Sequence, residues 1–136
     1  MSLDGEYDPD NIFAKIVRGE APAAKVYEDH DTLAFMDVFP QGRGHVLVVH
    51  KRSHARNLLD VDPQDMHAVM TSVQRVARAV RAALKPDGIF IAQFNGAVSG
   101  QVLAMATHSA RLLPVSRSRL ARIAAKYLAC RSVRFD

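Results

Sequence analysis

The amino-acid sequence predicts an α+β fold, in which an antiparallel sheet carries one long helix on one face and a short helix precedes the first strand. Short runs of strand-forming residues follow one another closely, an apolar stripe then recurs at helical spacing, and further strand-like residues come after it. The chain has 136 residues, 49% of them hydrophobic and 24% charged. It can therefore bury a core of its own, and the disordered and fibrous classes are excluded.

The short helix is predicted to begin after Asn11, whose side chain can accept a hydrogen bond from an amide of the first turn. Ile12, Phe13 and Ile16 follow at helical spacing. Gly19, soon followed by a proline, is expected to end the helix. Residues 1–10 are polar and contain glycine and proline, so we expect a flexible lead-in.

The strands near the start are predicted at Lys25–Glu28, Thr32–Asp37 and His45–His50, where β-branched and aromatic residues are common. The polar segment Asp29–Asp31 is expected to form a tight turn, which makes the first two strands a hairpin. The segment from Phe39 to Gly44 contains proline and glycine and is predicted to be a loop.

The long helix is predicted to begin at Asp62 and Pro63, a capping carboxylate followed by proline at the first helical position. Gly88 is expected to end it, and Ile89–Phe94 is expected to form another strand. An apolar stripe along the helix is expected to face the core; it consists of Met66, Val69, Met70, Val73, Val76, Ala77, Val80 and Leu84.

The cysteine content and the hydropathy of the sequence indicate the expected cellular location. The single cysteine, Cys130, excludes an internal disulfide and is typical of a reducing compartment, so we expect a cytoplasmic protein. No uncharged apolar run reaches the ~20 residues that a membrane span needs. The acidic N-terminal residues do not resemble a secretory signal peptide.

The net charge of +4 is concentrated at one end of the chain. Residues 1–110 hold eleven basic and thirteen acidic side chains, whereas residues 111–136 hold seven basic and one acidic. We expect residues 115–136 to form a basic helix or tail. Such a tail can bind RNA or an acidic protein, but it does not interleave aromatic residues for base stacking, so nucleic acid is not the expected partner.

Two loops that adjoin strands are candidate binding sites. Asp37 ends a strand, where its carboxylate could accept hydrogen bonds from sugar hydroxyls. His45 opens the next strand beside Gly44, where a ligand can approach the backbone closely. The second loop, residues 95–101, contains glycines whose backbone amides could form an anion nest for a phosphate. Each loop taken alone is more typical of an ordinary turn than of a binding site.

Taken in order, these segments resemble the histidine triad (HIT) nucleotide-binding family. The similarity runs from residue 11 to residue 101 and includes Ile12–Glu20, Lys25–Asp29, Leu33–Asp37, Gly44–Val49, Asn57–Leu59, Asn95–Gly96 and Gly100–Gln101. The resemblance implies a small α+β homodimer that binds purine nucleotides such as AMP. It also implies cleavage or transfer at the α-phosphate through a nucleotidyl-histidine, as in phosphoramidate or dinucleoside polyphosphate hydrolases, with no cofactor.

The resemblance also assigns roles to individual residues. Asp37 would hold the ribose, and His45 matches a histidine that supports the catalytic triad. The base pocket would be walled by Ile12, Phe13 and Ile16. The phosphate would be cradled by Asn95, Gly100 and Gln101.

The His-x-His-x-His strand that names the family is not matched. The segment after Gln101 contains one histidine, His108. Counting forward from Gln101, or back from the Leu-Leu-Pro run at 112–114, assigns the triad to odd-numbered positions, which hold Met105, Thr107, Ser109 and Arg111. Alternation along a strand then puts His108 on the opposite face, unless a β-bulge re-aims it.

Three explanations of this mismatch stay open. The chain can be a relative that binds nucleotides without catalysis, or a bulge can make His108 the nucleophile. Alternatively, the reading frame can be altered after Gln101. An alternative to the nucleotide-binding function is that the protein is a non-catalytic dimeric module, which uses its basic tail to bind RNA or an acidic protein.

The remaining polar residues receive simpler interpretations. We expect no metal, because the positions that correspond to a zinc-binding cysteine pair in some family members are Asn11 and Ala14. His30 and His67 are expected on the surface. The basic cluster from His50 to His54 is interpreted as a solvated strand end. The main domain is predicted to span residues 11–114.

Overall fold

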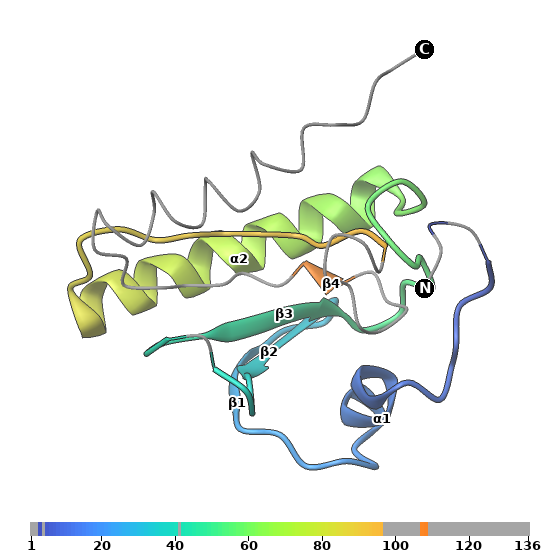
Figure 1. Ribbon diagram of the computed structural model, residues 1–136, viewed down its shortest axis with the longest axis horizontal. Coiled ribbons are helices and arrows are strands. Elements are labelled where there is room, and N and C mark those ends of the chain that lie inside the picture. The colour runs from blue at the N-terminus through green and yellow to red at the C-terminus, as the bar shows by residue number, and fades with distance from the viewer. Residues whose placement is uncertain (1–2, 4, 41, 97–106, 109–136) are drawn as a thin grey trace.

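A four-stranded antiparallel sheet lies between two helices (Figure 1). The computed structural model describes residues 3, 5–40, 42–96 and 107–108. In chain order the elements are α1 (Ile12–Arg18), β1 (Lys25–Glu28), β2 (Thr32–Met36), β3 (Val46–His50), α2 (Pro63–Leu84) and β4 (Thr107–His108). The predicted α+β fold, with one long helix and one short N-terminal helix, is confirmed.

The sheet has the strand order β1-β2-β3-β4, and each neighbouring pair is antiparallel. In the β2–β3 pair, Thr32 lies opposite His50 and Met36 lies opposite Val46. Beyond this ladder, the Asp37 amide donates to the His45 carbonyl at 3.2 Å. Asp37 and His45 therefore lie just outside the strands in which they were predicted, although they continue the pairing.

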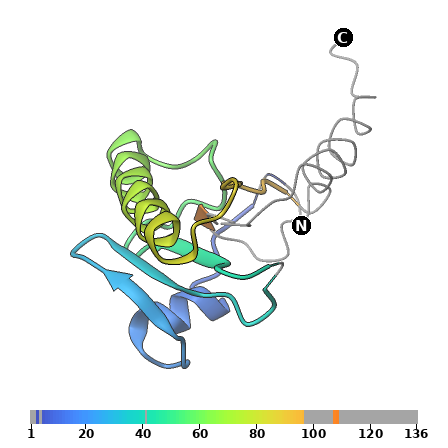
Figure 2. The same ribbon diagram turned by 90° about the vertical axis from the view of Figure 1, so that its left-hand side faces the viewer.

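Alternation along β2 and β3 divides the core between the two faces of the sheet. On the face covered by α2, here called the α2 face, the buried cluster consists of Ala34, Val46, Val48, Val69, Val73 and Val76. On the other face, here called the α1 face, it consists of Ile16, Leu33, Phe35, Leu47 and Val49. Both views of the ribbon show the helices on opposite sides of the sheet (Figures 1 and 2).

The limits of α1 are set by local hydrogen bonds, as predicted. The side chain of Asn11 accepts hydrogen bonds from the amides of Phe13 and Ala14, each at 3.0 Å. At the other end Gly19 adopts the left-handed conformation, with φ of 79°, which glycine reaches without a Cβ clash.

The long helix begins as predicted and ends earlier than predicted. The Asp62 side chain caps it by accepting a hydrogen bond from the Gln64 amide at 2.8 Å, and Pro63 is the first helical residue. Lys85, with φ of 45°, terminates it three residues before Gly88. Pro86 explains the early end, because a residue that precedes proline is disfavoured in the α-helical conformation.

Two further expectations concern the segment after α2 and the apolar character of the helices. The prediction of a strand at Ile89–Phe94 is wrong for the structure described, in which this segment is extended but pairs with no described strand. It instead returns along α2, and Ile89 packs against the α2-face cluster (Figure 1). None of the described helices is long and apolar enough to cross a bilayer.

The first ten residues make defined contacts where the structure describes them. The Leu3 carbonyl accepts a hydrogen bond from the Asn57 side chain at 2.9 Å. The Tyr7 ring stacks on the His54 ring, with the centroids 5.0 Å apart. The flexibility expected for residues 1–10, and the domain limits 11–114, stay predictions. The basic tail at 115–136 lies outside the described residues.

Candidate functional site

The Asp37 carboxylate and the His45 imidazole meet where β2 ends and β3 begins. Oδ2 of Asp37 lies 3.2 Å from Nδ1 of His45, and Oδ1 accepts a hydrogen bond from the Phe39 amide at 2.9 Å. A carboxylate facing Nδ1 favours the tautomer that carries its proton on that nitrogen. The His45 side chain is 4% exposed and that of Asp37 is 19% exposed, so the carboxylate is the more accessible partner.

Asp37 and His45 continue the α1 face of the sheet. Both are odd-numbered positions, in line with Phe35 on β2 and Leu47 on β3, whose side chains pack on this face. The alternation therefore assigns the carboxylate–imidazole pair to the face of the sheet on which α1 packs.

The apolar residues assigned to the base pocket come from α1 and lie beside this face. The rings of Phe13 and Phe35 are tilted by 45° with centroids 5.8 Å apart, a favourable geometry for an aromatic pair. Ile16 is buried in the α1-face cluster, whereas Ile12 is 44% exposed. Ile12 and Phe13 thus offer accessible apolar surface, and Ile16 supports them from the core.

Asn95 is the one residue of the predicted phosphate cradle that the structure describes. Its Oδ1 accepts a hydrogen bond from the Leu58 amide at 2.7 Å, so it links this loop to the segment that connects β3 to α2. The next residue, Gly96, has φ of 80°, a conformation that favours glycine. Gly100 and Gln101 lie outside the described residues.

The backbone register of β4 bears on His108. It pairs His108 with Val48 and Thr107 with Val49. Val48 belongs to the α2-face cluster and Val49 to the α1-face cluster, so position 107 is the one in register with the face on which Asp37 and His45 lie. The assignment of His108 as a catalytic residue stays a prediction.

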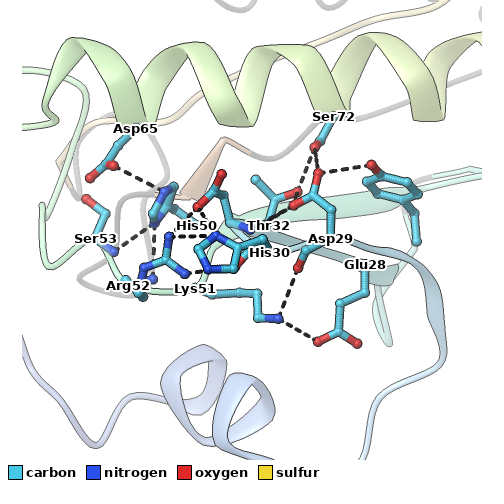
Figure 3. Close-up of polar contacts among 12 residues, drawn as sticks. Glu28, Asp29, His30, Thr32, His50, Lys51, Arg52, Ser53, Asp65 and Ser72 are labelled. Carbon is cyan, nitrogen blue, oxygen red and sulfur yellow. Dashed lines mark hydrogen bonds and ion pairs between the residues drawn. The ribbon is translucent and has the colours of Figure 1, made fainter.

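Sequence reasoning missed a polar network centred on Asp29, in the β1–β2 turn (Figure 3). Oδ1 accepts hydrogen bonds from the Thr32 amide at 2.7 Å and from the Thr32 hydroxyl at 3.0 Å. Oδ2 accepts from the Tyr27 hydroxyl at 2.9 Å and from the Ser72 hydroxyl at 3.2 Å. Ser72 belongs to α2, so the network ties the hairpin to the long helix.

This network changes the acidity of Asp29. Partial burial by itself raises the pKa of the carboxyl, but hydrogen bonds from Thr32, Tyr27 and Asp31 outweigh it and lower the pKa from 3.8 to about 2. A usable sequence signal was present, since an aspartate three residues before a threonine is typical of a turn closed by its own side chain.

The interpretation of the basic cluster as a solvated strand end is wrong for His50. This side chain is 4% exposed, and its Nε2 lies 3.2 Å from the Asp65 carboxylate of α2 (Figure 3). Its Nδ1 accepts hydrogen bonds from the amides of Arg52 and Ser53. Burial lowers the pKa of His50 below 6.5, although Asp65 opposes this effect. An even position on β3 faces α2, which explains the burial.

The neighbouring basic residues are held in ion pairs. Lys51 donates to Glu28 at 2.9 Å and to the Asp29 carbonyl at 3.1 Å. Arg52 pairs with Asp31. The surface positions expected for His30 and His67 are confirmed.

Metal ligation finds no support in the part of the chain that the structure describes. No group of three or more His, Cys, Asp or Glu side chains is gathered there closely enough to hold an ion. The expectation that the chain binds no metal stays a prediction.

Comparison with known proteins finds the family to which the sequence resemblance points, over a largely overlapping part of the chain. The HIT domain family model matches residues 18–106. An uncharacterised HIT-like protein of Mycobacterium tuberculosis is 40% identical over 92 residues, which are 68% of this chain and 63% of that protein. An adenylylsulfatase of Arabidopsis thaliana is 35% identical over 94 residues, 69% of this chain and 47% of that protein.

Solved structures agree with this match. A HIT-like protein from Bartonella henselae, described as involved in cell-cycle regulation, is 41% identical and superposes with a TM-score of 0.73 over 88% of this chain and 95% of that one. The alignments with the curated relatives from Mycobacterium and Arabidopsis cover less than two thirds of those proteins. The match of a family model across most of the described residues, with relatives of this identity, shows that the chain belongs to the HIT family.

Proposed function

We propose that this chain binds a purine nucleotide of the AMP type on the α1 face of the sheet. The contact between Asp37 and His45, at 3.2 Å, carries the proposal, because it holds a partly accessible carboxylate in a fixed orientation on the face of the sheet on which α1 packs. A carboxylate in that position can accept hydrogen bonds from both hydroxyls of a ribose. Membership of a family in which one relative is an adenylylsulfatase supports an adenine nucleotide.

The base is proposed to lie against Ile12 and Phe13, with Ile16 behind them. These side chains provide accessible apolar and aromatic surface on the helix next to the sheet, and a purine gains stabilisation from stacking on such surface. The phosphate is proposed to lie at the loop that contains Asn95, Gly100 and Gln101. Asp37 is proposed to orient the His45 imidazole.

We propose binding without efficient turnover. A nucleotidyl-histidine requires a neutral imidazole aimed at the α-phosphorus. The positions assigned to the triad by counting forward from Gln101, or back from residues 112–114, hold no histidine. Thr107, which has the backbone register of the α1 face, offers only a hydroxyl, a weak nucleophile unless a base activates it.

Calorimetric titration with AMP tests the binding site. Asp37→Asn keeps an acceptor but loses the charge, and it is expected to weaken AMP binding about tenfold, since hydrogen bonds to charged groups contribute roughly 1.5–3 kcal/mol. Asp87→Asn, an exposed carboxylate after α2, is the matched control and is expected to bind as the parent does. Equal affinity of the Asp37→Asn variant and the parent would remove the ribose assignment.

Turnover assays separate the explanations of the missing triad. Adenosine phosphoramidate and diadenosine polyphosphates are expected to bind but not to be cleaved. Cleavage accompanied by an acid-labile adenylyl-histidine at His108 would favour the β-bulge explanation instead. Absence of both binding and turnover would contradict the nucleotide proposal.

The chain is also proposed to act as a cytoplasmic homodimer. An exposed apolar surface supports this: Met70 of α2 is 46% exposed and Ile91 is 45% exposed, and both line a depression of about 450 Å³ together with Val73 and Ala77. Sedimentation equilibrium of the parent and of Met70→Glu tests the proposal, since a charge in a buried interface is expected to shift the protein toward monomer.

A further inference from the structure

A groove on the α2 face lies apart from the proposed nucleotide site. It has a volume of about 470 Å³, within the range of roughly 300–1,000 Å³ typical of small-molecule sites. The β1–β2 hairpin and the strand ends form one wall, and the C-terminal half of α2 forms the other. Its apolar surface comes from Val26, Met36, Val46, Val76, Val80 and Leu84.

The charged residues of the groove are both cationic. Arg43 and Arg75 line it, and no carboxylate is among its described lining residues. The ion pairs formed within the described ranges involve neither arginine. An apolar groove with positive charge at its edge is complementary to a molecule with an apolar body and an anionic group.

Arg75 is held in place by an uncharged partner. Its Nη1 donates to the Tyr27 hydroxyl at 2.6 Å, and the guanidinium carbon lies 5.9 Å from the centroid of the Tyr27 ring. The same hydroxyl donates to Asp29 at 2.9 Å, which fixes its direction. The guanidinium is thus oriented before any ligand arrives and retains further N–H donors for an anion.

We propose that this groove binds an amphipathic organic carboxylate, whose alkyl chain lies between the hairpin and α2 and whose carboxylate pairs with Arg75 and Arg43. Burial of the chain supplies the affinity, because apolar area removed from water is stabilising. Arginine supplies the preference for an anion, because its planar fork matches a carboxylate.

The groove and the nucleotide site lie back to back on the sheet. Met36 and Val46 line the groove, whereas the next residues along the chain, Asp37 and His45, continue the opposite face. A ligand in the groove therefore does not compete with AMP, and the two proposals stand or fall separately.

Calorimetric titration with decanoate, kept below its micelle concentration, tests the proposal. Decanoate is expected to bind at one site per protein chain. Decyltrimethylammonium, which carries a positive charge on an alkyl group of the same length, is expected not to bind. Arg75→Gln is expected to weaken decanoate binding about tenfold through loss of a charge-assisted hydrogen bond. Arg78→Gln, an exposed arginine of α2 outside the groove lining, is the matched control and leaves affinity unchanged.

A second variant blocks the groove rather than removing its charge. Ala79 is exposed on α2 and lines the groove, so Ala79→Trp fills the space without disturbing the buried core. This variant is expected to abolish decanoate binding while AMP binding, circular dichroism and melting temperature remain those of the parent.

The opposite results would overturn the proposal. These are absence of decanoate binding to the parent, equal binding of the cationic probe, or undiminished decanoate binding by Ala79→Trp. If Ala79→Trp changes the oligomeric state in sedimentation equilibrium, the groove is an interface between copies of the chain rather than a ligand site.

Discussion

Asp29 provides a direct test of how the hairpin is held to the long helix. Its carboxylate accepts hydrogen bonds from Tyr27, Asp31, Thr32 and Ser72. Asp29→Asn removes the charge but keeps an oxygen that can accept the two backbone amides of the turn. The hydroxyls of Tyr27 and Ser72 can rotate to accept from the new amide group, so the substitution isolates the effect of the charge.

The size of the effect follows from the pKa of Asp29, which folding lowers from 3.8 to about 2. One pKa unit corresponds to about 1.4 kcal/mol, so the ionised carboxylate stabilises the folded state at neutral pH by at most ~2.4 kcal/mol. Asp29 is only partly buried, and solvent screening reduces this figure to about 2 kcal/mol.

The pH dependence has a definite direction. The folded-state pKa lies below the unfolded one, so the unfolded chain binds the proton first as pH falls. The stabilisation is therefore complete above about pH 5, is about half lost by pH 3 and disappears near pH 1. The difference in unfolding free energy between the parent and Asp29→Asn should decrease over the same range.

Urea unfolding followed by circular dichroism at pH 7, 5, 4 and 3 measures this difference. Asp87→Asn is the control, because it removes an exposed carboxylate elsewhere and should leave stability within about 0.5 kcal/mol of the parent. The reasoning would be refuted if the difference for Asp29→Asn stayed constant from pH 7 to pH 3, or if that variant were as stable as the parent at pH 7.

Two further predictions concern His50 and Gly19. Burial lowers the pKa of His50 below 6.5, so the unfolded chain takes up the proton first, and the stability of the folded state should fall as pH drops below about 6.5. His50→Gln should therefore reduce the decrease in melting temperature between pH 7 and pH 5. The exposed control His67→Gln should leave that decrease unchanged. Gly19 has φ of 79° and open space around its Cα, so Gly19→Ala should destabilise by about 1 kcal/mol in urea unfolding, for conformational reasons alone. Gly88→Ala, at an equally open position without positive φ, should have no such effect, and equal losses for the two variants would contradict this account.

The two faces of the sheet separate structural from proposed binding residues. On the α2 face, Thr32 and His50 are polar but bonded to Ser72 and Asp65 of the long helix. On the α1 face, the carboxylate of Asp37 remains partly accessible. Buried polar groups with partners stabilise one arrangement of the elements, whereas an accessible carboxylate in a fixed orientation can bind a ligand.

Much of the fold was predictable because its determinants are local. The Asn11 cap and the left-handed Gly19 limit α1, and the Asp62-Pro63 pair begins α2. Each of these effects acts over a few residues, through a side chain bonding a nearby amide or through a backbone angle. The end of α2 differs from the prediction at Gly88: the helix ends at Leu84, because Pro86 disfavours the helical conformation in the residue before it.

The candidate site was predictable in part. The places of Asp37 and His45 at strand ends, together with the family resemblance, predict both as site residues, and the structure brings their side chains to 3.2 Å. The sequence also predicts a break in the family pattern after Gln101, and the family model ends at residue 106.

The sequence by itself determined the fold class, the caps, the hairpin turn and the family, because periodicity and short-range hydrogen bonding are readable along the chain. Only the tertiary structure decided that Thr32 bonds to Ser72, 40 residues away, that His50 is buried against Asp65, and that Arg75 lines an apolar groove. The physical reason is that the environment of a polar side chain depends on which distant element packs over it, and alternation along a strand specifies a face but not its partner.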